Sequence, residues 1–195
     1  MKSIFDKRDF NYKRDITNHY YYTGIFNDEE CELIKSLGSK SNLTEGLAGS
    51  IVRPGYRKSK ISWLPENKET KWLYEKLGIL VKQANKICWN FDIIGFGEQL
   101  QYGEYSEANR GFYDWHLDMG KNSNWRKISI SVQLDDENDY IGGDLQFYTK
   151  QTLTNAPRKK GSVIMFPSYL LHRVTPVVKG VRHSLVTWIT GPPFR

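Results

Sequence analysis

The segment DWHLDMG, residues 114–120, places a histidine and an aspartate two positions apart in a run that otherwise has the composition of a strand. Side chains at positions i and i+2 of a strand point to the same side of a sheet. We therefore expect His116 and Asp118 to converge on one point. An imidazole and a carboxylate that converge need a partner between them, so this short segment predicts a functional site built on a β-sheet.

Composition predicts a folded globular protein. The chain has 195 residues, of which 39% are hydrophobic and 14% aromatic, and this excludes a disordered chain. Such a length suits one domain with a sizeable core. We expect a single domain over residues 1–195, with an entry segment and loop at 1–57 and the core of the domain at 58–193.

The charge balance is basic, with a formal net charge of +6 and a pI near 9.2. A positive balance favours acidic small molecules or nucleic acid through long-range attraction, but it also fits an ordinary solvated surface. Lysine and arginine are spread along the chain, and the basic run at residues 158–160 is too short to predict a nucleic-acid patch.

The two cysteines, Cys31 and Cys88, form neither a disulfide framework nor a C-x-x-C metal site. Residues 1–15 lack the apolar core of a signal peptide, and no apolar run reaches membrane-spanning length. We expect a soluble, cytoplasmic protein.

The first third of the chain predicts a helix, a loop and a strand. Residues 27–38 read as a helix that Asn27 caps and Gly38 ends. Residues 39–57 are polar and rich in glycine, which indicates a loop, and residues 59–64 alternate like a strand.

The longest helical pattern covers residues 67–91. Apolar residues recur there at spacings of three and four, which predicts one buried face. Its members are Leu73, Leu77, Leu80, Ala84 and Ile87, with Val81 and Cys88 widening the stripe.

The second half of the chain predicts short strands separated by turns. We expect a hairpin turn at Gly142-Gly143. Strands without intervening helices indicate an antiparallel sandwich or barrel. The strand-like runs are residues 97–102, 113–118, 127–134, 143–148, 162–166, 170–175 and 183–190.

Two further residues complete a set with His116 and Asp118. His172 and Arg182 each lie on a predicted strand. Two imidazoles and one carboxylate that leave open positions are the ligands of non-haem Fe(II) oxygenases. A nearby arginine can bind a carboxylate in bidentate fashion, and Ser184, two residues further on, faces the same way. Each residue alone fits a structural role, but the four in this order favour a metal site.

The chain resembles the Fe(II)- and 2-oxoglutarate-dependent dioxygenases. The resemblance covers residues 58–193 and is carried by residues 101–118, 126–148 and 161–192. The nearest branch is the prolyl 4-hydroxylase-like proteins, including the bacterial PKHD-type hydroxylases. This resemblance implies a mainly β fold with supporting helices, the double-stranded β-helix or jelly-roll barrel.

The resemblance also implies roles for individual residues. The two histidines and the aspartate would bind Fe(II), and Arg182 would bind the far carboxylate of 2-oxoglutarate. Tyr102 matches a tyrosine that lines the co-substrate pocket in relatives, and Gln133 falls where relatives place another pocket residue. Dioxygen would be the oxidant, and ascorbate keeps the iron reduced in relatives.

The activity that the resemblance implies is hydroxylation of a C–H bond with release of succinate and CO₂. A prolyl residue in a peptide is the substrate that the nearest branch indicates. The alternatives are a free amino acid or small molecule, or a non-catalytic relative that binds 2-oxoglutarate. Nucleic-acid demethylases of this superfamily carry a second arginine where this chain has Trp188, which argues against a nucleic-acid partner.

Two polar segments, residues 39–57 and 119–126, are candidates for mobile loops that flank the mouth of the barrel and close on substrate, and the alternative is that they are plain surface connections. Four aromatic residues near the H-x-D pair could line a substrate groove or could belong to the core and rim. They are Tyr105, Tyr113, Trp115 and Trp125. The sequence does not indicate an oligomeric state.

Overall fold

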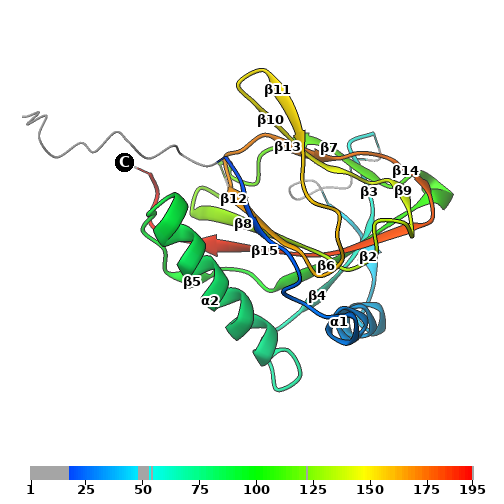
Figure 1. Ribbon diagram of the computed structural model, residues 1–195, viewed down its shortest axis with the longest axis horizontal. Helices are drawn as coiled ribbons and strands as arrows, with labels where there is room; N and C mark the ends of the chain where they lie inside the picture. The colour runs from blue at the N-terminus through cyan, green and yellow to red at the C-terminus, as the bar shows by residue number, and fades with distance from the viewer. Residues whose placement is uncertain (1–17, 48–52, 54, 122, 195) are drawn as a thin grey trace, which may run out of the picture.

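A computed structural model describes residues 18–47, 53, 55–121 and 123–194 of the chain (Figure 1). Two antiparallel sheets form the body of this described part. The larger sheet contains, in order, β1 (Tyr20–Tyr22), β12 (Val163–Pro167), β8 (Arg126–Gln133), β15 (Val181–Thr190), β6 (Leu100–Ser106), β4 (Lys60–Leu64) and β2 (Thr44–Glu45), and β5 (Gly95–Phe96) also pairs with β15.

The smaller sheet lies across from the larger one (Figure 1). It contains, in order, β11 (Thr152–Asn155), β10 (Leu145–Thr149), β13 (His172–Val174), β7 (Phe112–His116) and β3 (Arg57–Lys58). A separate pair joins β14 (Val177–Lys179) to β9 (Ile141–Gly142). This is the predicted jelly-roll arrangement, and each predicted strand of the second half has a counterpart.

The larger sheet has two different faces, as β8 illustrates. Ile128, Ile130 and Val132 belong to the main hydrophobic core, together with residues of the two helices. The alternating serines Ser129 and Ser131 are also buried, but they point toward the smaller sheet. Because successive side chains of a strand point to opposite faces, one strand supplies both the core and the polar space between the sheets.

Helix α1 (Asp28–Lys40) begins as predicted, since Asn27 and Glu30 form a reciprocal capping box. The predicted end at Gly38 is wrong, because the helix continues to Lys40. Gly38 serves packing instead: a Cβ atom there would lie 2.2 Å from Cγ of Tyr102 on β6. Glycine therefore allows the helix to lie directly against a buried aromatic ring.

Helix α2 (Lys71–Cys88) buries most of the predicted stripe, including Leu73, Leu77 and Val81. The prediction is wrong for Ile87, whose side chain is 59% exposed. At 100° per residue Ile87 falls just outside the arc that faces the sheet, so it lies in solvent at the margin of the stripe.

Two other local predictions need correction. Gly142 and Gly143 both have positive φ, but they make no hairpin, since β9 pairs with β14 and β10 with β11 and β13. The glycines carry the chain between strands that do not pair with each other. The predicted loop at residues 39–57 contains the end of α1, β2 and the first residue of β3, and its residues 48–52 and 54 lie outside the described residues.

Both cysteines are buried in the core, and burial raises the pKa of the Cys31 thiol to about 11. A thiol in this state is unreactive. Within the described ranges, neither helix has the length and apolar character needed to cross a membrane.

Replacing Gly38 with alanine should destabilise the protein by about 1–3 kcal/mol, because the new methyl group overlaps a buried ring that has little room to shift. The matched control is Gly78→Ala in α2, where the new Cβ meets only Phe96 at an ordinary 3.6 Å. Helix propensity should make that change neutral or stabilising by up to about 1 kcal/mol. Urea denaturation measures both, and equal effects would contradict the packing role of Gly38.

Candidate metal and co-substrate site

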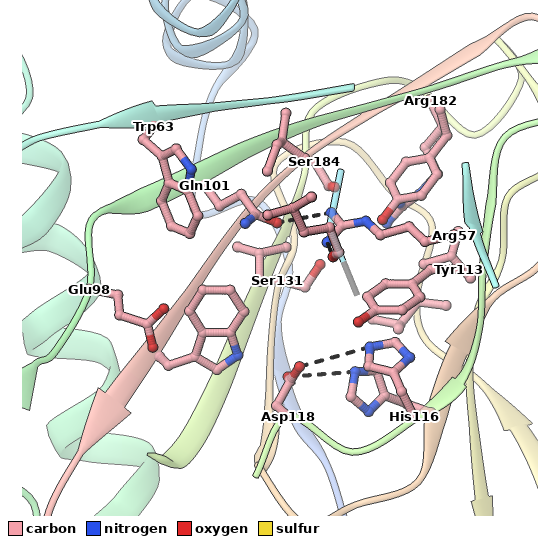
Figure 2. A pocket seen from close by; sticks show the side chains of 18 of the residues that line it. Arg57, Trp63, Glu98, Gln101, Tyr113, His116, Asp118, Ser131, Arg182 and Ser184 are labelled. Atoms are coloured by element: carbon pink, nitrogen blue, oxygen red, sulfur yellow. Dashed lines mark hydrogen bonds and ion pairs between the residues drawn. The ribbon is translucent and has the colours of Figure 1, made fainter. Parts of the chain in front are cut away.

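A cavity of about 570 Å³ lies between the two sheets (Figure 2). Its walls come from β6, β8 and β15 on one side and from β7, β10 and β13 on the other. It contains all four residues of the predicted set, and Ser184 lines it as well. It also reaches Thr44, Glu45, Leu47 and Arg57, which lie in the segment predicted to precede the core.

Strand pairing brings the three predicted metal ligands together. His116 ends β7 and is the register partner of His172, which begins β13. Asp118 follows two residues after His116, so its carboxylate meets both imidazoles (Figure 2). All three side chains are buried, and their potential ligand atoms lie within 4.8 Å of one another.

Hydrogen bonds to backbone carbonyls fix the tautomers of both histidines. Nδ1 of His116 donates to the carbonyl of Asp114 at 2.6 Å, and Nδ1 of His172 donates to the carbonyl of Leu170 at 2.8 Å. A carbonyl oxygen can only accept, so each Nδ1 carries the proton and each Nε2 keeps its lone pair. Nε2 of His116 lies 3.8 Å from Oδ1 of Asp118, and Nε2 of His172 lies 3.5 Å from Oδ2. A metal ion would sit between these atoms.

The electrostatics favour the protonation states that bind a metal. Burial lowers the pKa of His116 to about 3, with the neighbouring His172 adding to the effect, so the imidazole is neutral. Burial opposes ionisation of the Asp118 carboxyl, but its electrostatic interaction with His172 and His116 and a hydrogen bond from Ser129 outweigh that cost, so the pKa of this carboxyl is lowered. Neutral imidazoles and an ionised carboxylate are the forms that ligate Fe(II).

Ser129 and Ser168 hold the carboxylate of Asp118 in place. The Ser129 hydroxyl donates to Oδ2 of Asp118 at 2.6 Å and lies 3.0 Å from the Ser168 hydroxyl. The Ser168 carbonyl accepts from the backbone N–H groups of Asp118 and Met119. These contacts leave Oδ1 of Asp118 without a hydrogen bond among the described residues, so it can act as a single-oxygen ligand.

Arg182 is a buried cation with spare donors. Its side chain is 1% exposed, and Nη2 donates to Oε1 of Gln133 at 2.9 Å. Within the part of the chain that the structure describes, Nε and Nη1 have no hydrogen-bond partner. A buried charge with unpaired donors is costly, so this arrangement fits a carboxylate ligand in the cavity. Gln133 orients the guanidinium, and Ser184 lies nearby (Figure 2).

The prediction that Tyr102 lines the pocket is wrong. Neighbouring positions of β6, including Gln101 and Tyr105, face the cavity, whereas Tyr102 faces the core and pairs in register with Leu185. Its ring stacks on His183, with centroids 5.8 Å apart. The tyrosines that line the cavity are Tyr105 and Tyr113.

Of the other predicted aromatics, Trp115 lies under the guanidinium of Arg173 and against Tyr148, outside the cavity. Trp125 is 42% exposed and does not line the cavity. In residues 119–126, which we predicted to flank the mouth, Arg126 reaches the cavity and residue 122 lies outside the described residues.

Sequence reasoning missed two buried or half-buried arginines. Arg57 donates to Ser59, to the carbonyl of Leu47 and to Gln101, and Arg126 forms a bidentate pair with Glu98 at 2.6 Å. Arg57 follows a glycine- and proline-containing stretch that reads as a loop and gives no signal. Ser129 and Ser131 of β8 were also not predicted as site residues. The sequence does contain a signal for them, because polar and apolar residues alternate from residue 127 to residue 134, which places both serines on the polar face of the strand.

Comparison with known proteins agrees with this geometry. Residues 100–190 match the 2OG-Fe(II) oxygenase superfamily. A PKHD-type hydroxylase from Synechococcus sp. (strain CC9311) is 30% identical over 173 residues, which cover 85% of this chain and 74% of that protein. The chain belongs to the 2OG-Fe(II) oxygenase superfamily. It is an oxidoreductase of the PKHD-type branch. Two other PKHD-type matches are shorter and span 36% and 38% of those relatives.

Solved structures with little sequence identity share the fold of this oxygenase. A Pseudomonas putida prolyl-4-hydroxylase is 16% identical with a TM-score of 0.73, and the match covers 90% of this chain and 93% of that one. A Trichoplax adhaerens prolyl hydroxylase, solved with a hypoxia inducible factor peptide, is 17% identical with a TM-score of 0.76, covering 89% and 84%. They confirm the predicted double-stranded β-helix.

Replacing Arg182 with glutamine should raise the Michaelis constant for 2-oxoglutarate by about 10- to 100-fold, since charged hydrogen bonds contribute roughly 1.5–3 kcal/mol. Steady-state kinetics with varied 2-oxoglutarate measures this. The control is Arg173→Gln. Like Arg182, Arg173 donates to a glutamine, Gln146, but it lies on the outer face of the smaller sheet. An Arg182→Gln enzyme with an unchanged constant would contradict the assignment.

Proposed function

We propose that this oxygenase uses Fe(II), 2-oxoglutarate and dioxygen to hydroxylate a prolyl residue within a peptide. One oxygen atom of dioxygen would enter the substrate C–H bond as a hydroxyl group. The other would enter succinate as 2-oxoglutarate loses CO₂. The observation that supports this most strongly is that His116, Asp118 and His172 are buried in the same cavity as Arg182, two of whose nitrogens have no hydrogen-bond partner among the described residues. The ascorbate requirement and the cytoplasmic location stay predictions.

The protein residues divide the work within the cavity. His116, Asp118 and His172 would hold the iron, which supplies activation of dioxygen and oxidative decarboxylation of the co-substrate. Arg182 would hold the far carboxylate of 2-oxoglutarate and so orient its keto acid end toward the metal. Ser129 keeps the Asp118 carboxylate turned to the cavity.

The cavity favours a peptide over a free amino acid. A free amino acid brings a carboxylate that needs its own cation inside the cavity. Every guanidinium nitrogen of Arg57 and of Arg126 already donates to a protein oxygen. Among the described arginines that line the cavity, Arg182 alone has unpaired nitrogens, and 2-oxoglutarate would take those.

Two aromatic side chains that line the cavity suit a pyrrolidine ring. Trp188 and Trp63 line the cavity with ring centroids 6.4 Å apart. The indole Nε1 of Trp188 is buried without a hydrogen-bond partner among the described residues, so it can donate to a carbonyl of a bound peptide. The Trichoplax relative in fold was solved with a peptide, which supports the same substrate class.

The test compares short proline-containing peptides, acetylated and amidated at their ends, with free L-proline. The purified enzyme is loaded with Fe(II), 2-oxoglutarate and ascorbate, and both succinate and the gain of one oxygen atom are measured. We expect succinate and hydroxylated product in equal amounts from peptides, and at least about tenfold less product from free proline. Arg173→Gln serves as an active control and His116→Ala as an inactive one.

Hydroxylation of free proline at the higher rate would reject the peptide substrate and support the amino-acid alternative. Succinate formation without any hydroxylated peptide would reject the prolyl substrate while leaving the oxygenase chemistry intact.

A further inference from the structure

Arg57 connects the edge of the smaller sheet to the metal-binding histidine. The side chain is 7% exposed and its three nitrogens are directed by Ser59, by the Leu47 carbonyl and by Gln101. This places the guanidinium carbon 4.6 Å from the centre of the Tyr113 ring (Figure 2). A cation over an aromatic face is attractive, and most so where water is excluded.

The Tyr113 ring also contacts His116, which stacks on it. Their ring centroids are 3.6 Å apart and their planes differ by 14°, so the two rings are stacked. Burial raises the pKa of the Tyr113 phenol, which keeps the ring neutral. The His116 imidazole is therefore held at its Nδ1 atom by the Asp114 carbonyl and on its face by the tyrosine.

We propose that Arg57 is a positioning residue that acts through Tyr113 to hold His116 in its metal-binding orientation. The hydrogen bonds fix the guanidinium, the guanidinium fixes the ring, and the ring prevents the imidazole from turning away from Asp118. This inference rests on the proposed metal site. Removing partners that orient a ligand lowers metal affinity by about 10- to 100-fold, and we expect Arg57→Gln to weaken Mn(II) binding by about tenfold.

The measurement is a titration of metal-free enzyme with Mn(II), in which electron paramagnetic resonance reports the free ion. Mn(II) replaces Fe(II) because it is stable in air, and no turnover is needed. The matched control is Lys58→Gln, which removes the exposed cation next to Arg57 on the same strand. Arg57→Lys, which keeps the charge but not the planar group, should fall between Arg57→Gln and the wild type.

A double-mutant cycle separates this role from a general effect on folding. Tyr113→Leu should weaken Mn(II) binding about as much as Arg57→Gln, whereas Tyr113→Phe, which keeps the ring, should bind like the wild type. If Arg57 acts through Tyr113, adding Arg57→Gln to Tyr113→Leu should change the affinity less than about threefold. A merely structural arginine would lower the melting temperature without this coupling.

The outcomes are distinguishable. If the wild type does not bind Mn(II), or if His116→Ala binds it equally well, the proposed metal site fails. If the wild type binds and His116→Ala does not, but Arg57→Gln and Arg57→Lys keep wild-type affinity, only the role of Arg57 fails. The role of Arg57 would also be overturned if the fold-losses in Mn(II) affinity caused by Arg57→Gln and Tyr113→Leu multiply in the double variant.

Discussion

The antiparallel pairing of His172 with His116 is the constraint on which the site depends. It brings together two residues 56 positions apart in the sequence and directs both imidazoles into the cavity. Because side chains alternate across a strand, a slip of one residue in this pairing would turn one histidine to the outer face. The two backbone carbonyls that accept from the Nδ1 atoms belong to the same two segments, so pairing also fixes the tautomers.

The larger sheet makes the cavity possible because it serves two environments. One face carries the apolar residues that pack on α1 and α2, and this packing orders the strands. The other face carries Ser129, Ser131, Gln133 and Arg182, which are buried although they are polar. Such groups are stable when they are bonded: Ser129 donates to Asp118 and Arg182 donates to Gln133, while spare donors are left on Arg182.

Sequence patterns predicted the strands of the second half, a sandwich or barrel, and the four residues that the structure gathers in the cavity, and the family resemblance implied that the barrel is a jelly roll. The H-x-D spacing correctly placed Asp118 beside His116, although β7 ends at His116 and Asp118 lies just beyond it, where its N–H donates to the Ser168 carbonyl. The resemblance, and not a local pattern, assigned Tyr102 to the pocket, and this was wrong because Tyr102 lies on the face of β6 that packs on the core, opposite Gln101. Arg57 was missed because only the pairing of β3 with β7 places it over Tyr113, and no local pattern contains that pairing.

The central claim is that the His116–Asp118–His172 set binds iron that 2-oxoglutarate then chelates beside Arg182. The most direct measurement is an anaerobic titration of the enzyme with Fe(II) and 2-oxoglutarate, in which visible absorption reports the charge-transfer band of a chelated keto acid. We expect a band in the wild type, no band in His116→Ala, and a band in Arg182→Gln only at much higher 2-oxoglutarate. An iron-loaded wild-type enzyme without the band would contradict the claim.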